Sequence, residues 1–433
     1  MEAIEPLDTP DAPQPPPGND AYAVFRDRDF RLYLVGRFVA SFGQLMFAMA
    51  VGWELYDRTG SAMALAMIGL TLVVPMALFT LPAGHVADNY NRKHVIVVTT
   101  ILMACANVGL ACISGLRAPV EWTYLCLFIA GSARTFLWAA TASFLPQLVE
   151  RKLFSRAVTW NSSAFQLSSI LGPAAAGFII EHDGHRAWPV YALNALAAIV
   201  CCTLVSLIKK EHVVKAREKM SLRNLLTGFR FVFSTRIIIG IISLDMFAVL
   251  LGGATALLPV YAKEILHVGP AWLGCLQTAL PLGAIVCSFV LAHRPPLQKA
   301  GRALLWAVAG FGVATIGFGF SQWFWLSFLM LFLAGATDNV SVVVRHTLVQ
   351  LLTPDEKRGR VSAVNNLFIG TSNELGEFES GAVAHLFGRA MGNTAAMGAV
   401  VSVVSGGVGT ILVVLMIAWL WPEIRKYGRL DAH

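Results

Sequence analysis

Charged residues are scarce in this chain. Only 14% of its 433 residues are Asp, Glu, Lys or Arg, whereas soluble domains usually carry about 25%. A helix that crosses a ~30 Å hydrocarbon core needs about 20 predominantly apolar residues. The composition therefore excludes a series of soluble domains and predicts an all-α, multi-pass membrane protein. Stretches long enough for a span and free of all four charged types include 59–84, 94–116, 188–208, 265–292, 303–337 and 390–422.

Signatures of other function classes are missing as well. The sequence contains no G-x-S-x-G or H-E-x-x-H active-site pattern and no G-K-[ST] phosphate loop. Its seven cysteines lie in apolar stretches and show no metal-binding or redox spacing. We therefore expect no enzyme activity, no cofactor and no metal site.

A secretory signal is also lacking. Residues 1–21 are acidic and contain six prolines, so they have neither the basic start nor the apolar centre of a signal peptide. We expect a disordered, proline-rich cytoplasmic tail there, and we expect the first span to act as the insertion signal.

The apolar stretches predict twelve transmembrane helices. Of the 33 Lys and Arg residues, 26 fall on the side of these spans that holds both termini and five on the other side. Positive charge resists translocation, so we expect both termini in the cytoplasm. We also expect a bacterial-type inner membrane as the location and no nucleic-acid partner. The predicted spans are 32–56, 62–84, 95–116, 121–147, 158–181, 188–208, 238–261, 268–292, 303–320, 323–349, 361–387 and 394–421.

A polar segment divides the chain into two six-helix bundles, 22–208 and 238–421. The linker between them, 209–237, has apolar side chains at helical spacing among basic ones. This pattern fits an amphipathic helix in contact with lipid of the inner leaflet, and it fits a solvated linker helix equally well. A short cytoplasmic tail, 422–433, ends the chain. The apolar positions of the linker are Leu222, Leu225, Leu226, Phe229 and Phe233.

The two halves repeat one another. At an offset of 204 residues, Asn161 aligns with Asn365 and Arg134 with Asp338, so spans four and five recur as spans ten and eleven. Duplicated halves with a site at their interface are a transporter architecture.

The loop after the second span, GHVADNYNRK at 84–93, resembles the signature loop of the major facilitator superfamily, G-x-L-A-D-R-x-G-R-[RK]. It departs from that pattern at Asn89 and Asn91. A glycine permits close helix approach, the aspartate can face an arginine or a helix N-terminus, and the basic pair holds the loop inside. The conformational-gate residues expected here are Gly84, Asp88, Arg92 and Lys93.

The fifth span contains Gly172, Pro173 and Gly177 in a segment that looks like the antiporter motif G-P-x-x-G-G. Proline removes a backbone hydrogen bond, and small neighbours let another helix pack closely. These residues are expected gate residues, although a purely structural kink explains them too. The likeness to export members of the superfamily favours efflux.

Segments 338–345, 359–365 and 373–381, with 53–61 near the start, resemble the enterobactin-exporter-like branch, which also contains drug-efflux proteins. The resemblance covers about 22–421. It implies export by alternating access, driven by proton antiport, and does not identify the substrate. We expect a monomer, and a mixed-charge, aromatic cavity that suits a small amphiphilic solute, siderophore- or drug-like. A lipid flippase, a passive facilitator or a transport-like sensor on the same scaffold is the alternative.

Charged side chains inside spans are costly, at least about 2.5–3.5 kcal/mol at the centre, so we expect them to be functional. Arg134 and Asp338 occupy equivalent repeat positions and could pair or compete for substrate in the central cavity; each could instead be neutralised within its own bundle. Arg345, near a span end, is expected to snorkel. The predicted cavity residues are Gln44, Arg134, Asp338 and Asn373.

Span eleven carries three acids: Glu377 lies on a polar stripe at helical spacing, Glu374 lies beside that stripe, and Glu379 points elsewhere. Three carboxylates near the midplane cannot all stay charged cheaply, so one of them is expected to carry a proton. We favour Glu377, followed by Glu374 and by Asp245 of span seven. Glu379 is about 200° from Glu377 around the helix and is expected to pair structurally.

Overall fold

The computed structural model describes residues 22–209, 229–295, 298–392 and 394–428. These residues are almost entirely helical and contain no β-strand. The short 3₁₀ segments η1 (Ala23–Arg26) and η2 (Arg151–Leu153) precede α1 and α5. The helices of the first half are α1 (Arg28–Thr59), α2 (Ala62–Asn89), α3 (Arg92–Gly115), α4 (Glu121–Leu148), α5 (Phe154–His182) and α6 (Trp188–Ser206).

The second half contains six further spans. The first of them is composite, and the other five are single helices. A short helix, α15 (Pro422–Lys426), follows the last span. The composite span consists of α8 (Arg236–Leu251), η3 (Ala254–Leu257), α9 (Leu258–Val260) and the π-helical turn η4 (Tyr261–Ile265). The single helices are α10 (Pro270–Ala292), α11 (Ala300–Gly319), α12 (Phe324–Leu351), α13 (Asp355–Ala390) and α14 (Ala395–Leu420).

The all-α, twelve-span architecture predicted from the sequence is confirmed, with helix ends within a few residues of the predicted spans except at the start of α13. Within the described residues, eleven spans are long and apolar enough to cross a membrane. The twelfth, α13, is too polar to meet that criterion, since acids, amides and glycines interrupt its apolar residues.

Polar caps set several helix ends. The side chain of Asp27 accepts the backbone N–H of Asp29 at the start of α1, and the side chain of Asn91 accepts that of Lys93 at the start of α3. Such caps satisfy N–H groups that lack intrahelical partners. Gly60 ends α1 in the left-handed region at φ 59°, a conformation that costs glycine little.

The composite span differs from the single helix predicted over 238–261. It is interrupted after Leu251 by Gly252 and Gly253. At Gly253 the backbone passes so close to α13 that an added Cβ would lie 2.7 Å from Ser380 Oγ. The two glycines therefore break the helix and allow this approach.

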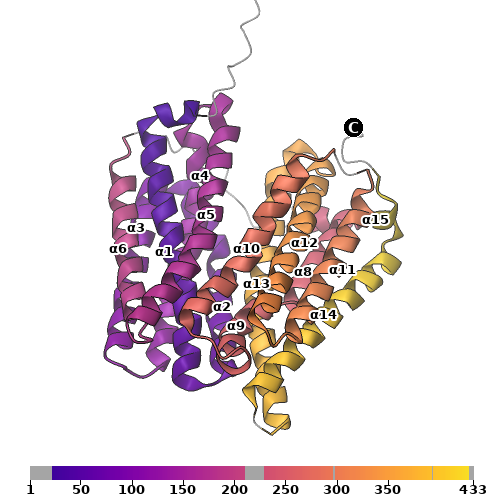
Figure 1. Ribbon diagram of the computed structural model, residues 1–433. Helices are drawn as coiled ribbons and strands as arrows, with labels where there is room; N and C mark the ends of the chain where they lie inside the picture. Colours follow the sequence, from indigo (N-terminus) through magenta and orange to yellow (C-terminus); the bar gives the residue numbers. More distant parts are fainter. Residues whose placement is uncertain (1–21, 210–228, 296–297, 393, 429–433) are drawn as a thin grey trace, which may run out of the picture.

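Figure 1 shows the twelve spans as two bundles, α1–α6 and α8–α14, side by side. We call the side of the molecule that holds both described chain ends the terminal side, and the other side the distal side. The bundles meet at the distal side and stand apart at the terminal side. The domain boundaries drawn from the sequence stay a prediction, and most of the predicted amphipathic linker, 210–228, lies outside the described residues.

The buried apolar side chains follow this shape. One cluster in the distal half combines both bundles, with Tyr56 of α1, Tyr261 of η4 and Leu273 of α10 among its members. In the terminal half the clusters are separate, one around Phe144 in the first bundle and another around Leu348 in the second. The bundles therefore share a core only on the distal side.

The predicted repeat is visible in the helix crossings. Gly131 of α4 packs against Leu72 of α2, and Gly335 of α12, its partner at the offset of 204, packs against Leu280 of α10. Glycine at both positions lets the helices approach closely. The same contact has therefore been kept in both halves.

Candidate functional site

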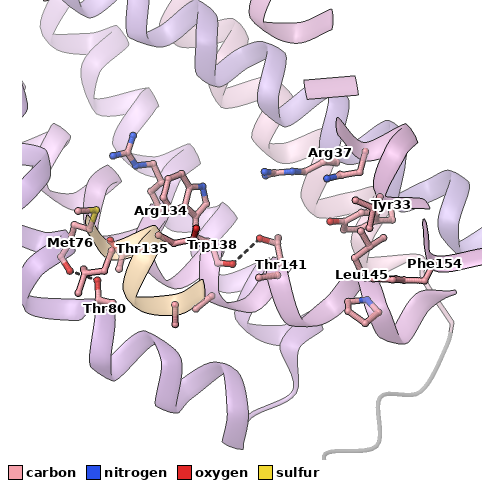
Figure 2. Close-up of a pocket in the computed structure, with 18 residues that line it drawn as sticks. Tyr33, Arg37, Met76, Thr80, Arg134, Thr135, Trp138, Thr141, Leu145 and Phe154 are labelled. Atoms are coloured by element: carbon pink, nitrogen blue, oxygen red, sulfur yellow. Dashed lines mark hydrogen bonds between the residues drawn. The ribbon is translucent and has the colours of Figure 1, made fainter. Parts of the chain in front are cut away.

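A cavity of about 500 Å³ lies between the bundles on the terminal side. Its walls come from α1, α2, α4 and α5 of the first bundle and from α13 of the second. It reaches Phe154, the first residue of α5, and so opens toward the terminal side. Figure 2 shows Arg37 and Arg134 projecting into it from α1 and α4. We call it the terminal cavity; its lining includes Tyr33, Arg37, Arg134, Trp138, Phe154 and Asn366.

A second cavity of about 220 Å³ lies deeper, between α1, α2, α4, the composite span, α10 and α13. Arg134 lines both cavities. We call this one the central cavity. Its polar lining includes Gln44, Arg134, Thr255, Gln277, Glu374 and Glu377.

An ion pair joins the bundles at the wall of the central cavity. The guanidinium of Arg134 donates to the carboxylate of Glu374, and these side chains are 25% and 12% exposed. Arg134 also lies over the Trp138 ring, 5.7 Å from its centroid. The hypothesis that Arg134 pairs with Asp338 is therefore wrong, and so is the alternative that Arg134 is neutralised within its own bundle. Asp338 lies on α12, which packs against α10 and α11 within the second bundle, whereas α13 faces the first.

The helix α2 fixes the position of the α13 carboxylates. Gly69 of α2 packs against the backbone of Glu374, and a Cβ at Gly69 would lie 3.1 Å from the Cβ of Glu377. Glu377 lies one turn from Glu374 and faces the central cavity. Two carboxylates thus share this cavity with one guanidinium, so the cluster carries a net negative charge unless it binds a proton or a cation.

The other predicted cavity and carrier residues are more dispersed. Gln44 lines the central cavity, whereas Asn373 is exposed and Asp338 is half-buried, and neither lines the terminal or the central cavity. The carboxylate of Asp338 makes no hydrogen bond or ion pair with another described residue. Glu379 is half-buried and accepts a hydrogen bond from Ser380 Oγ at 3.3 Å.

Asp245 of α8 forms a buried ion pair with Arg345 of α12, inside the second bundle. Arg345 is only 3% exposed, so the expectation that it snorkels to the membrane surface is wrong. The carboxylate of Asp245 provides its counter-charge in the interior. This contact favours a structural role for Asp245, and its role in proton coupling stays a prediction.

The predicted gate loop lies where α2 ends and α3 begins. Lys93 Nζ donates to the backbone carbonyls of Ser206 and Ile208 at 2.8 and 2.7 Å, which ties the start of α3 to the end of α6. A cation is favourable at the C-terminal end of a helix. Arg92 is buried, and the side chain of Asp88 lies outside the described part of the structure. Gly84, the first residue of the 84–93 segment, lies within α2.

The predicted motif of α5 lies at a crossing of the two bundles. Gly177 packs against Pro270 and Ala271 of α10, and Gly274 of α10 packs in turn against Pro173. An added Cβ at Gly177 would lie 3.1 Å from the Cα of Ala271. Close approach of α5 and α10 therefore depends on these glycines. Gly172 packs on the other side, against α1.

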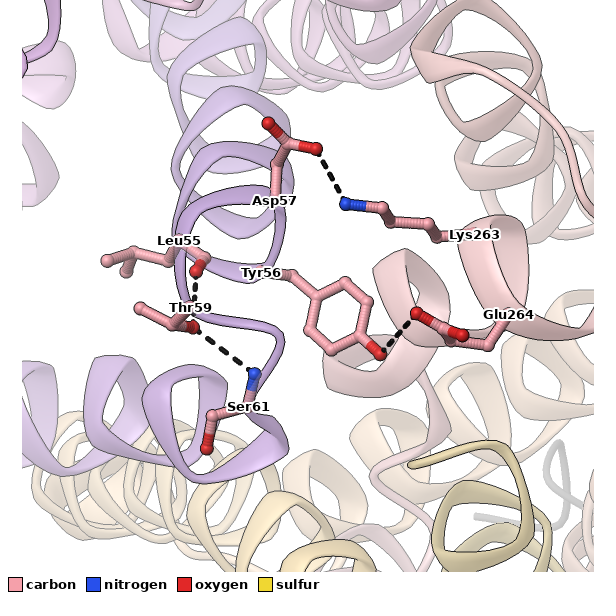
Figure 3. A network of polar contacts seen from close by, with 7 residues as sticks. All are labelled: Leu55, Tyr56, Asp57, Thr59, Ser61, Lys263 and Glu264. Carbon is pink, nitrogen blue, oxygen red and sulfur yellow. Dashed lines mark hydrogen bonds and ion pairs between the residues drawn. The ribbon is translucent and has the colours of Figure 1, made fainter. Parts of the chain in front are cut away.

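Polar contacts between the bundles close the distal side, and the sequence reasoning did not find them. The hydroxyl of Tyr56 donates to Glu264 at 3.1 Å, and Lys263 Nζ lies 2.7 Å from Asp57 Oδ1. Figure 3 shows both contacts between the end of α1 and η4. In the sequence, each of these residues taken alone is typical of a charged loop residue or of an aromatic residue at the membrane interface. The one available signal was opposite charge in the corresponding first distal loops of the two halves.

Arg37 is the other site residue that sequence reasoning missed; it is one of the 26 Lys and Arg residues assigned to the terminal side. In the structure it lies within α1 and lines the terminal cavity. The signal was its position inside the first predicted span.

The fold, the cavities between the bundles and the intramembrane ion pairs define a membrane transporter. The family model of the major facilitator superfamily matches residues 33–377, and the chain belongs to this superfamily. Its members are transporters, which confirms that the chain is not an enzyme.

Within the superfamily, the chain is 27% identical to the enterobactin exporter EntS of Citrobacter koseri, with 92% of this chain and 93% of that one covered. It is 25% identical over the same shares to EntS of Escherichia coli O1:K1 / APEC. These relatives confirm the resemblance to the enterobactin-exporter-like branch.

Solved structures agree in fold. The crystal structure of a bacterial homologue of the human lysosomal transporter Spinster, in an inward-facing and unoccupied conformation, matches with a TM-score of 0.69 at 16% identity, covering 92% of this chain and 97% of that one. The nucleoside transporter NupG matches with a TM-score of 0.71 at 13% identity, covering 92% and 100%.

Proposed function

We propose that this protein is a secondary active exporter of a small amphiphilic solute. In this proposal the halves 22–208 and 238–421 move relative to each other, so that the site between them faces alternately the terminal and the distal side. Protons entering the cell drive the cycle. The gate residues are those of the 84–93 loop and of the α5 motif, and the monomer is the working unit.

The observation that carries the proposal is the cluster of Arg134, Glu374 and Glu377 between the bundles. Its ion pair spans the interface that must rearrange during alternating access. Protonation of Glu377 removes the surplus negative charge and so changes the electrostatic balance that holds the bundles together. Binding of a proton and the change of conformation are thereby linked at this cluster.

The orientation follows from the charge distribution. Because the terminal side carries most of the Lys and Arg residues, we place it in the cytoplasm of a bacterial-type inner membrane. The terminal cavity then loads from the cytoplasm, and the contacts Tyr56–Glu264 and Asp57–Lys263 are those that must break for release.

The substrate class is inferred from the cavity lining. Tyr33, Trp138 and Phe154 offer aromatic surface beside the charged groups of the terminal cavity, a combination that suits an amphiphile. The curated relatives are named for enterobactin, so a siderophore is the first solute to test and an amphiphilic drug the second.

The test is uphill transport by the purified full-length chain in proteoliposomes with imposed pH gradients. We expect enterobactin or an amphiphilic drug to accumulate against its gradient only when protons run in the opposite direction, and an uncoupler to abolish this accumulation. Equilibration of both solutes without regard to the pH gradient would contradict proton coupling and favour a passive facilitator.

A further inference from the structure

Arg37 occupies an unusual position for a cation. It lies nine residues after Arg28, the first residue of α1, which is about 14 Å along the helix axis. The side chain is partly buried and projects into the terminal cavity. It makes no hydrogen bond or ion pair with another residue of the described chain.

The charge of Arg37 is not compensated in the cavity that it lines. Among the described residues of this lining, none is Asp or Glu. The second guanidinium, that of Arg134, is already paired with Glu374, which lies on the wall of the central cavity. Charged groups at membrane depth are costly and are usually paired. A guanidinium in this setting is therefore ready to bind an anion.

An apolar recess adjoins Arg37 inside the first bundle. This third cavity, of about 240 Å³, lies between α1, α3, α4, α5 and α6. Arg37 and Trp138 line both it and the terminal cavity. Its other walls are mainly apolar, with Leu45, Met103 and Phe165 among them. An aromatic or acyl group can enter the recess while an attached acid remains beside Arg37.

Building on the proposed export function, we propose that the terminal cavity selects an anionic amphiphile. Its acidic group, a carboxylate, sulfonate or phosphate, binds the guanidinium of Arg37, for which a bidentate contact is available. Its apolar part lies against Trp138 and extends into the recess. Arg37 is thus the residue that sets the charge preference of the substrate site.

The test is equilibrium binding of two matched fluorescent probes to the full-length protein in nanodiscs of phosphatidylcholine. Dansylglycine carries a carboxylate, and dansylglycinamide is its neutral counterpart. We expect the wild-type protein to bind dansylglycine at least tenfold more tightly. Arg37→Gln should remove this preference and leave affinity for the amide unchanged. Arg37→Lys should retain most of the preference.

The controls separate charge from folding. Arg31→Gln removes one positive charge from an exposed position of the same helix and should leave both affinities unchanged. Trp138→Leu should weaken both probes alike, because it removes aromatic surface without touching the anion contact. Binding of the amide by the Arg37→Gln variant reports that its cavity is folded.

A lipid headgroup could supply the same acidic chemistry as a soluble acid. Adding phosphatidylglycerol to the nanodiscs distinguishes the two sources: displacement of dansylglycine assigns the anion site to a lipid, and unchanged binding assigns it to a soluble acid. Equal affinity of the wild-type protein for both probes, or binding of neither, would overturn the inference. Because only equilibrium binding is measured, that result would leave proton-driven export untouched.

Discussion

Arg134 of α4 and Glu374 of α13 are 240 positions apart in the chain and form an ion pair across the interface of the two bundles. The contact lies at the wall of the central cavity, one helical turn from Glu377. Any movement that opens the distal side by separating α4 from α13 must break it. This pair therefore belongs to the state that is open on the terminal side.

The first prediction concerns this pair. Arg134→Gln or Glu374→Gln should each reduce transport by about tenfold, since either leaves a charge without its partner. The exchange Arg134→Glu with Glu374→Arg should recover part of the loss and show a coupling energy of about 1–2 kcal/mol. The losses and the coupling energy are obtained from transport rates in proteoliposomes, normalised to reconstituted protein. The matched control, an exchange of Arg134 with Asp338, should recover no transport. Strictly additive losses for the Arg134 and Glu374 variants would contradict the ion pair between these residues.

Glu377→Gln mimics a protonated carboxyl with almost no change in volume. It should abolish pH-driven efflux while leaving substrate binding and downhill exchange measurable, because the proton-dependent step no longer alternates. Glu379→Gln is the matched control on the same helix and should act mainly on stability and expression. If Glu377→Gln retains gradient-driven efflux, the proton is carried elsewhere, and Glu374 is the next residue to test.

The buried pair of Asp245 and Arg345 should stabilise the second bundle. Asp245→Asn leaves the guanidinium of Arg345 buried without a counter-charge and should lower the free energy of unfolding by about 3 kcal/mol. The double variant Asp245→Leu with Arg345→Met should recover most of it. Thermal unfolding in detergent measures the stability of the single and of the double variant. Glu423→Gln is the control. It breaks the ion pair with Arg236, in which the side chains of Arg236 and Glu423 are 71% and 41% exposed, and it should change the free energy of unfolding little.

A loss of proton coupling in Asp245→Asn with unchanged thermal stability would reverse this assignment. Asp245 would then be assigned to proton coupling.

The distal closure depends on close contact between α5 and α10. Gly177→Val should force these helices apart, because an added Cβ meets the backbone of Pro270 and Ala271. Spin labels at Thr59 and His267, in a background without cysteine, should then report a wider distribution of distal distances. Gly115→Val is the matched control, since its Cβ meets nothing closer than 4.0 Å. An unchanged distribution in Gly177→Val would show that other contacts suffice.

The topology can be checked independently of any substrate. Reporters fused to the C-terminus or within 209–236 should report the cytoplasm, and one within 182–186 should report the opposite side. Alkaline phosphatase and green fluorescent protein fusions provide complementary signals. A cytoplasmic signal from 182–186 would reverse the orientation and, with it, the direction of transport.

Most of the fold could be predicted from the sequence because the bilayer leaves few options for an apolar segment of about 20 residues. The polar span α13 was also among the predicted spans, and its repeat relation to α5 agrees with that prediction. The irregular composite span was not, although Gly252 and Gly253 stand next to each other at its break.

The site was harder to predict, and Arg134 shows why. Equivalence in a repeat assigned it to Asp338, but equivalent helices occupy corresponding places in two different bundles and do not face each other. The partner in the structure is Glu374 of α13, the span that follows the one carrying Asp338, and α13 packs against the first bundle. Such a pairing depends on the relative placement of the bundles, and no local pattern encodes that placement.

The polarity of α13 has a consequence for how the protein is made. A segment that carries Glu374, Glu377 and Glu379 and falls short of the apolarity of the other eleven spans partitions poorly into lipid on its own. Its small and polar residues find partners on α2, α8 and α14, and two of these helices are synthesised before it. During biosynthesis α13 must therefore leave the translocation channel against helices that are already inserted, and a chain truncated before α14 should be a target of membrane quality control.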